Sequence, residues 1–470
     1  MQYIPKPRTT FIEGQQSGSD IDVLIQIEGP GLESYPRWYQ RAPLDLVMVV
    51  DISTDIDIMS FCLVQNAIKF VANNLGPKDR FSIVSCTTPA TRLLRLCPMD
   101  STGLPNALHV VSLLVPGGPT DFVDGLKIAA QILEERIYRN PVASIIVLSN
   151  VSNHSWSTRQ PSCGINPEYL NQLPDSISPR MMPPTGNHPF PVHAFGLGVR
   201  HDPLALYGVS LESSGTYSYV ESYAVLQDAV ATCLGGLQSV VAQNIRLNVS
   251  TLPLLHLQRI QYAKFNIQRL PYGAEFNIGN LYANERKFFL VTFGGIPETT
   301  EENMNLRRHV RAFAVYTEPT SQIRLWIIDK VLMRAQSIQR NLTSRDLGSE
   351  HMDLLSIFLG IPDDIEDDIN RVESVGPGFA SMSNSFNAFR LLAEPNSMVK
   401  QWLWDETMAL VERIESAEGY ENGGLAFLLS KKSSHEFQRA TTSGCRVIGF
   451  PLFVTWSMTD MLRRSCRVIN

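Results

Sequence analysis

Four short hydrophobic runs without polar alternation lie between positions 43 and 235, and this is the pattern of strands buried on both faces of a parallel sheet. They read LDLVMVV (44–50), RFSIVSC (80–86), ASIIVLS (143–149) and VHAFGLGV (192–199). Between them, apolar residues recur at helical spacing from Ile58 to Leu75 and from Val123 to Ile137, and the second helix is expected to end at Asn140. Strands that alternate with helices predict a doubly wound α/β fold, whose binding crevice lies beyond the carboxyl ends of the strands.

One long segment after the third strand interrupts this alternation. From Asn153 to Phe190 the sequence has no period, and its prolines exclude long helices. A loop of that length is either functional or disordered. Because it follows a strand end, it is expected to overhang the crevice.

After Leu237 the pattern changes to the alternation that is typical of antiparallel strands, so residues 238–322 are predicted to form a β-sandwich. The segment Asp20–Glu28 alternates in the same way and is expected to pair with strands between Ile245 and Tyr316. The α/β domain, residues 41–237, is then inserted into the sandwich or followed by it, and residues 1–40 form an N-terminal strand segment. Residues 323–420 have a helical pattern, and residues 421–470 have a mixed one.

Length and charge narrow the classes of partner. A chain of 470 residues exceeds one ordinary core and should form several units. Its net charge of -6 and the absence of a Lys/Arg run argue against nucleic acid as a partner. The sequence shows neither a secretory signal nor an apolar run long enough to span a membrane, so we expect a cytoplasmic protein without a membrane partner. The seven cysteines include no C-x-x-C pair, which favours buried free thiols over zinc ligands or disulfides.

The first strand runs directly into a cluster of oxygen-bearing side chains. Asp51, Ser53, Asp55 and Asp57 follow it on alternate positions. Either a cation sits among these oxygens, and Mg²⁺ is the ion that prefers such ligands, or the carboxylates point into water. Asp57 can also cap the helix that starts after it, and Asp121 can cap the next one, where the helix dipole favours a carboxylate. We expect capping for both.

No arrangement of residues in the sequence predicts catalysis. The chain has no phosphate-binding G-K-S/T loop and no G-x-S-x-G nucleophile motif. His154 lies near Asn150 but is expected at the surface, and two further histidines, His193 and His201, lack a third zinc ligand. Ser434 precedes a histidine directly, but neighbours in sequence do not make a catalytic dyad. The protein is therefore expected not to be an enzyme.

The strand that ends in Asp-x-Ser, the segment PGGPTDFVDGL and the strand that ends at residue 150 together resemble a von Willebrand factor type A domain. In that family an Asp-x-Ser-x-Ser motif, a Thr and an Asp hold Mg²⁺, which a carboxylate of the partner completes. The resemblance places this site at Asp51, Ser53, Asp55, Thr120 and Asn150. Asp55 stands where the family has Ser and Asn150 where it has Asp, so the charge of the set is kept but its geometry is changed. We expect a remodelled ion site, on which partner binding no longer depends strictly on Mg²⁺.

Longer blocks extend the resemblance. NPVASIIVLSN, PVHAFGLGVRHDP and GGLAFLLSKKSSHEFQRATTSG are similar, in the same order, to the plant wavy-growth group of RING-type ubiquitin ligases, and the last block resembles their Vwaint region. That group carries a RING finger with eight Cys/His zinc ligands, which these cysteines cannot provide. The resemblance implies a module that recruits a protein partner in ubiquitin-linked or defence signalling. The alternative is a RING-less or truncated ligase that acts with a RING-bearing relative.

Overall fold

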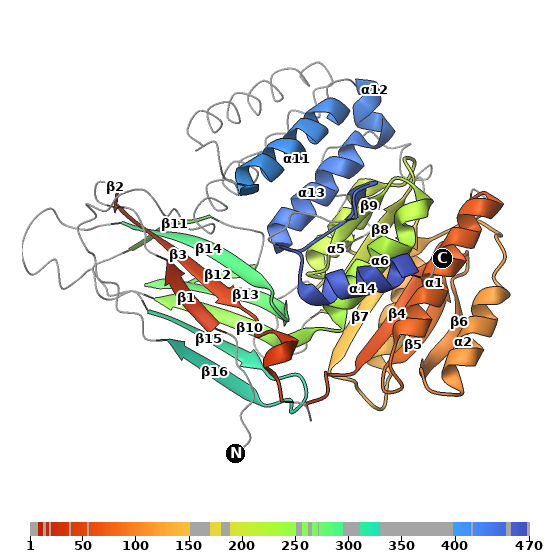
Figure 1. The fold of residues 1–470 in the computed structure, drawn as a ribbon, viewed down its shortest axis with the longest axis horizontal. Helices are drawn as coiled ribbons and strands as arrows, with labels where there is room; N and C mark the ends of the chain where they lie inside the picture. The colour runs from red at the N-terminus through yellow and green to blue at the C-terminus, as the bar shows by residue number, and fades with distance from the viewer. Residues whose placement is uncertain are drawn as a thin grey trace, which may run out of the picture. The chain divides into compact units, whose positions relative to one another are not determined.

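The computed structural model describes residues 8–12, 16–17, 20–36, 39–53, 56–150, 170–179, 189–250, 256–261, 266–270, 272–294, 311–329, 398–414, 417–447 and 453–467. These residues form two compact units, which we call the β unit and the α/β unit (Figure 1). The β unit contains the described residues up to Gln40, from Val240 to Asp329 and from Met398 to Asp405. The α/β unit contains those from Arg41 to Ser239 and from Glu406 onward.

The α/β unit is built on a seven-stranded sheet in which every neighbouring pair is parallel except β5 and β6. The order across the sheet is β17 (Ser443–Gly444), β9 (Tyr217–Val220), β8 (Val192–Leu197), β7 (Val142–Ser149), β4 (Leu44–Val50), β5 (Arg80–Ser85) and β6 (Thr91–Pro98). The four hydrophobic runs of the sequence are the inner strands β4, β5, β7 and β8, as predicted. All seven residues of β4 are buried, because helices cover the sheet.

In the described part of the chain before residue 240, these strands are connected or flanked by the α-helices α1 (Ile58–Asn74), α2 (Gly103–Ser112), α3 (Phe122–Glu134), α5 (Pro203–Glu212) and α6 (Leu226–Leu237). Gly125 lets α3 approach the sheet closely, since a Cβ there would lie 2.8 Å from Cγ1 of Val49. The predicted extension of this helix to Asn140 is wrong. The chain leaves the helix after Glu134, because Arg136 and the backbone N–H of Asn140 turn back to bind Asp45.

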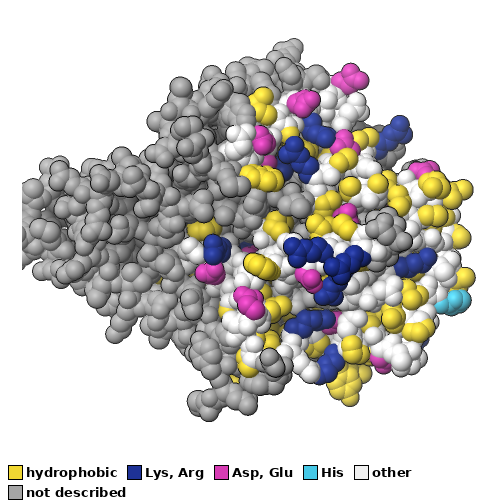
Figure 2. Space-filling model, viewed as in Figure 1, with side chains coloured by type: hydrophobic (Ala, Val, Ile, Leu, Met, Phe, Trp, Pro, Cys, Tyr) yellow, Lys and Arg dark blue, Asp and Glu magenta, His cyan; other side chains and the backbone are white. Residues whose placement is uncertain are grey.

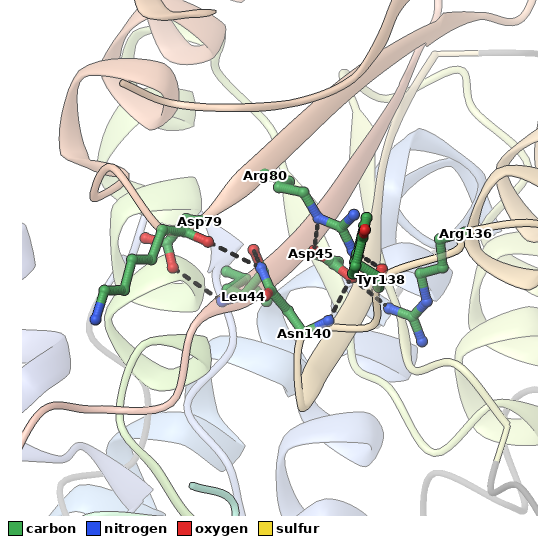
Figure 3. Close-up of polar contacts among 8 residues, drawn as sticks. Leu44, Asp45, Asp79, Arg80, Arg136, Tyr138 and Asn140 are labelled. Atoms are coloured by element: carbon green, nitrogen blue, oxygen red, sulfur yellow. Dashed lines mark hydrogen bonds and ion pairs between the residues drawn. The ribbon is translucent and has the colours of Figure 1, made fainter. Parts of the chain in front are cut away.

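Asp45 lies fully buried at the amino end of β4, between two arginines (Figure 3). Arg80 donates to both of its carboxylate oxygens, at 2.7 and 2.5 Å, and Arg136 donates to Oδ2 at 2.7 Å. The N–H of Asn140 adds a fourth hydrogen bond, at 3.1 Å. The starts of two strands and the loop that precedes a third are therefore joined at one carboxylate.

C-terminal helices, together with the part of α11 (Met398–Ile414) from Glu406 onward, complete the α/β unit. They are the short α12 (Ala417–Gly419), a π-helical turn η3 (Tyr420–Gly424), α13 (Leu425–Phe437) and α14 (Trp456–Arg467). Helix α14 packs on α6, which also contacts α1, and the three lie side by side in Figure 1. Helix α13 packs on α5 and β9. The described residues from 421 onward, which the sequence analysis separated from the α/β domain, contribute buried side chains to its core.

Three charged or titratable side chains are buried together where α11 and α13 meet. Glu406 accepts a hydrogen bond from the ammonium of Lys431 at 2.6 Å, and its second carboxylate oxygen lies 3.1 Å from Nε2 of His435. Each of the three side chains is at most 5% exposed. The ring of Phe453 stands edge-on against the imidazole, at a centroid distance of 5.4 Å. This cluster joins the C-terminal helices through polar contacts that water does not reach.

The described part of the β unit contains two five-stranded antiparallel sheets, a 3₁₀ turn, η1 (Leu32–Ser34), and the start of α11. One sheet has the order β1 (Arg8–Ile12), β3 (Asp20–Glu28), β14 (Arg286–Gly294) and β11 (His256–Gln261), with β2 (Gln16–Ser17) on β3. The other has the order β12 (Asn266–Leu270), β13 (Gly273–Tyr282), β10 (Val240–Ser250), β15 (Arg311–Thr317) and β16 (Arg324–Asp329). Phe276 and Phe289, one from each sheet, are fully buried with ring centroids 5.4 Å apart, so the sheets face each other across an apolar core.

The predicted pairing of the N-terminal segment is confirmed, because β3 pairs with β14 from Glu28 opposite Arg286 to Ile21 opposite Phe293. In the sequence, the strands of the α/β unit therefore lie between β3 and β14, which pair with each other in one sheet of the β unit.

The predicted helical region begins too early. Residues 324–329 form β16, since β15 offers them a free edge to pair with. Residues 330–397 lie outside the described part, and α11 is helical as predicted.

Candidate functional site

The candidate site lies at the carboxyl edge of the sheet, where β4 and β7 end beside each other. Because these strands pair in parallel up to Val50 and Leu148, the residues that follow them are neighbours in space. The hydroxyl of Ser53 lies 3.3 Å from Oδ1 of Asn150 and donates to it. The structure thus brings Asp51, Ser53 and Asn150 together, as the sequence predicted.

Both carboxylate oxygens of Asp51 accept hydrogen bonds, although the residue is completely buried. Oδ1 accepts from the backbone N–H of Ser53 at 2.9 Å, and Oδ2 accepts from the N–H of Asn150 at 3.1 Å and from the hydroxyl of Ser149 at 3.5 Å. Burial raises the pKa of Asp51, and the hydrogen bonds lower it only in part. The carboxylate thus holds the loop after β4 through backbone amides.

Thr120 lies on the segment between α2 and α3, which is tied to the same edge by its backbone. The N–H of Gly117 donates to the carbonyl of Ile52 at 2.7 Å, and the N–H of Asp121 donates to the carbonyl of Cys86 at 2.7 Å. Thr120 itself forms a β-bridge with Thr87. Within the described residues, no hydrogen bond joins its side chain to those that surround Asp51. The segment is therefore placed at the site, but the Thr120 hydroxyl is not bonded to the Asp51 cluster in the described part.

The two predicted caps are confirmed. The side chain of Asp57 accepts from the N–H of Ser60 at the start of α1, and that of Asp121 accepts from the N–H groups of Val123 and Asp124 at the start of α3. Each carboxylate satisfies amides that the first helical turn leaves open. Both helices begin at this edge, so the caps add two carboxylates to its surface.

Tyr223 belongs to the site although no pattern in the sequence predicts it there. It lies in η2 (Tyr223–Val225), which follows β9, and the side chains of Asn150, Asp51 and Asp57 are near enough to shift its pKa. Burial raises the pKa of its phenol, and the nearby carboxylates of Asp51 and Asp57 raise it further. The phenol therefore remains protonated and lies within the electrostatic reach of both acids.

Several other sequence candidates lie elsewhere. Asp55 and His154 fall outside the described residues, as does most of the Asn153–Phe190 segment. His193 is buried with Nδ1 2.8 Å from the hydroxyl of Thr216, and both ring nitrogens of His201 have hydrogen-bond partners. Ser434 donates to the carbonyl of Arg439, while His435 contacts Glu406. The expectation of buried thiols is wrong for three exposed cysteines, namely Cys62, Cys445 and Cys466.

Three of the five oxygen-bearing residues expected at the ion site, Asp51, Ser53 and Asn150, are joined by hydrogen bonds in the described part. Mg²⁺ requires a near-octahedral set of hard oxygen ligands. Asp51 is the one carboxylate in contact with Ser53 and Asn150 among the described residues, and both its oxygens already accept hydrogen bonds. No group of three or more His, Cys, Asp or Glu side chains in the described part is arranged to hold a metal ion. The Asp51 carboxylate is bonded to the backbone amides of Ser53 and Asn150, and the Ser53 hydroxyl to the Asn150 side chain.

Comparison with known proteins identifies the α/β unit. Residues 44–219 match the family model described as von Willebrand factor type A domain. These residues form a type A domain. The matched range runs from β4 into β9, so it contains the inner strands and the carboxyl edge described above. The domain's C-terminal helices lie beyond it.

Solved structures show the same fold over a longer range. A von Willebrand factor type A protein from Catenulispora acidiphila superposes with a TM-score of 0.58 at 13% identity, covering 84% of this chain and 89% of its own. The ArnB paralog VWA2 from Sulfolobus acidocaldarius gives a TM-score of 0.50 at 12% identity, covering 92% and 98%. At such identities the likeness concerns the fold alone. It extends well beyond the type A domain.

Sequence relatives are plant ubiquitin ligases. The chain is 28% identical over 311 residues to the E3 ubiquitin-protein ligase WAV3 of Arabidopsis thaliana, which is 65% of this chain and 38% of that protein. It is 29% identical over 261 residues to the probable E3 ubiquitin-protein ligase WAVH2 of the same plant, covering 54% of this chain and 32% of the relative. The chain thus matches less than two fifths of each relative's length.

In the described part, no helix has the length and apolar character to cross a membrane.

Proposed function

We propose that this chain is a non-enzymatic protein-interaction module whose type A domain binds a protein partner at the carboxyl edge of its sheet. The observation that carries this proposal is a set of large apolar side chains exposed around the Asp51 cluster. Ile58 and Met59 are 79% and 75% exposed, and Leu113 and Val115 are 64% and 70% exposed. Exposed apolar side chains that gather at one edge are typical of a protein interface.

The ubiquitin ligases among the relatives indicate the cellular process in which this binding takes place. We infer that the module recruits its partner in ubiquitin-linked or defence signalling in the cytoplasm of a plant cell. The oxygen set at Asp51, Ser53, Asp55, Thr120 and Asn150 is a remodelled ion site, and partner binding does not depend strictly on Mg²⁺. The closed hydrogen bonds between Asp51, Ser53 and Asn150 support this.

Affinity purification with the full chain tests the proposal. Met59→Arg places a charged side chain on the exposed first turn of α1, and Ile137→Arg places the same side chain at the opposite edge, where Ile137 is 89% exposed. Proteins cross-linked to the wild type are expected to be lost from Met59→Arg and kept by Ile137→Arg. They are also expected to survive chelation of Mg²⁺ by EDTA.

Contrary results separate the parts of the proposal. If the two arginine variants capture the same proteins, the crevice is not the binding surface. If EDTA releases the proteins, and calorimetric titration shows a saturable Mg²⁺ signal that Asp51→Ala removes, the site is a working ion site.

The ligase relatives favour a second candidate, a RING-less ligase subunit that acts with a RING-bearing partner. The chain alone is expected to show no ubiquitin transfer with a competent conjugating enzyme, because its cysteine pattern cannot supply the eight zinc ligands of a RING finger. Transfer should appear only when a RING-bearing relative is added, if this candidate is right. Autoubiquitylation by the purified chain, followed on a gel, would disprove both statements.

A further inference from the structure

Three described segments form one continuous surface around the Asp51 cluster, and we call this surface the acidic rim. They are residues 56–60 after β4, residues 86–90 after β5 and residues 113–121 between α2 and α3. The N–H of Thr88 donates to the carbonyl of Pro119 at 2.9 Å, which joins the second segment to the third. Gln65 of α1 donates to the carbonyl of Leu114 at 3.1 Å, which joins α1 to the third.

Many of the exposed side chains of the acidic rim are apolar. Besides the four exposed aliphatic residues that carry the proposed function, Pro89 and Pro119 are exposed on it. Figure 2 shows hydrophobic side chains gathered at the right of the view, over α1 and α2. The hydrogen bonds between its segments and the low rotamer freedom of its prolines reduce the entropy lost when a partner docks.

The charges of the acidic rim have one sign. None of its three segments contains Lys or Arg, while Asp57 and Asp121 are both exposed on it. The first basic residues that follow the segments in sequence are Lys69, Arg92 and Lys127. The amide groups at the starts of α1 and α3, which would otherwise attract an anion, are already bonded to the capping carboxylates. Asp51 adds a buried carboxylate beneath this surface.

We propose that the acidic rim binds a basic, apolar segment of a partner protein, with aliphatic or aromatic side chains against Ile58, Met59, Leu113 and Val115 and with Lys or Arg side chains toward Asp57 and Asp121. The inference rests on the proposed function and specifies the chemistry of its partner. The positive charge that the family's site takes from a metal ion is here supplied by the partner's side chains. Anionic lipid headgroups and nucleic-acid phosphates would be repelled by the same carboxylates.

Selection of random peptides displayed on phage, with the immobilised full chain as bait, tests this inference. Peptides that bind are expected to be rich in Leu, Phe or Met together with Lys or Arg, and poor in Asp and Glu. The affinity of a selected peptide is then measured by fluorescence anisotropy on three pairs of substitutions. Ile58→Gln with Met59→Gln removes apolar contacts, Asp57→Asn with Asp121→Asn removes charge but keeps both helix caps, and Ile137→Gln with Tyr138→Gln is the matched control at the opposite edge.

We expect the first pair to weaken binding about tenfold or more, because buried apolar anchors dominate interface energies. The second pair should weaken it about threefold at low salt and have little effect at high salt, since exposed charges are screened. The control pair should change nothing. Circular dichroism of each variant, compared with wild type, confirms that the fold is kept.

Two results would overturn the inference in distinguishable ways. Selected peptides that are acidic and need Mg²⁺, but still lose affinity with Ile58→Gln and Met59→Gln, would refute the assigned partner chemistry and leave the proposed function intact. If no peptide is selected, or if every selected peptide binds the first pair as tightly as wild type, the acidic rim is not a protein-binding surface and both proposals fail.

Discussion

Glu406→Gln is expected to lower the free energy of unfolding of the α/β unit by about 3–5 kcal/mol, because it leaves the ammonium of Lys431 buried without its counter-ion. Gln has nearly the same shape as Glu, so the loss reports charge and not volume. The side chain of Lys431 is 5% exposed, and no water can replace the carboxylate at that depth. Hydrogen exchange of the α13 amides, followed by mass spectrometry, measures this loss locally.

Two controls make the result specific. Asp405→Asn changes an exposed carboxylate on the same helix and should stay within about 0.5 kcal/mol of wild type. Glu406→Leu combined with Lys431→Met removes both charges and should recover much of the loss. Wild-type exchange rates in Glu406→Gln would show that the cluster does not stabilise these helices.

The same cluster should make stability depend on acid pH. Burial raises the pKa of Glu406, but the ammonium of Lys431 and the hydrogen bond from His435 outweigh it and lower the pKa to about 2. The folded pKa thus lies below the ordinary value of 4.5, so the folded state binds this proton more weakly than the unfolded state. The contribution to stability is fully present above pH 4.5 and is lost as the pH falls toward 2. In Glu406→Gln this part of the pH dependence should be absent.

Asp45→Asn is expected to destabilise the unit by a similar amount, about 3–5 kcal/mol, because two arginines then face each other without a carboxylate between them. The side chains of Arg80 and Arg136 are only 15% and 9% exposed. Burial lowers the pKa of Arg136, and the charge of Asp45 opposes that effect. The amides of β4 and β7 should lose most of their protection from exchange.

The matched control is Asp460→Asn, the same substitution in an exposed pair on α14. Asp460 and Arg464 are 57% and 55% exposed, and such a pair contributes at most about 0.5 kcal/mol. If Asp45→Asn is as mild as this control, the buried cluster has no stabilising role. Asp45→Asn should leave peptide binding at the acidic rim unchanged, since the two sites lie at opposite ends of β4.

The inner strands were predictable because burial on both faces leaves an uninterrupted apolar run, as in β4. The edge strands were not, since β6 has a single buried residue and β17 has only two residues. The helix expected up to Asn140 failed because Arg136 and Asn140 bind Asp45, a contact that no local pattern contains. In the same way β16 was read as helix, since its partner strand decides its structure.

At the site, Asp51 and Asn150 were predictable because each directly follows a strand of one parallel sheet. Tyr223 was not, because the strand that precedes it, β9, has only four residues and shows no clear pattern in the sequence. The sequence analysis also did not predict that the apolar residues of the acidic rim are exposed. Ile58 continues the helical apolar spacing of α1 but lies on its first turn, where the cap leaves it exposed. Periodicity alone cannot distinguish an exposed apolar residue on the first turn from a buried one further along the helix.

The pairing of β3 with β14 has a consequence for the order in which the chain matures on the ribosome. Glu28 and Arg286, which form an ion pair across these strands, are 258 residues apart in sequence. At about 5–20 residues per second, β3 waits roughly 10–50 s for its partner strand to be synthesised. The strands of the β unit are complete once Asp329 has emerged, whereas α13 and α14 of the inserted unit come from the last part of the described chain. The α/β unit, which begins later in the sequence, is thus the last to complete its fold. Its sheet must remain without α13 and α14 while the β unit folds.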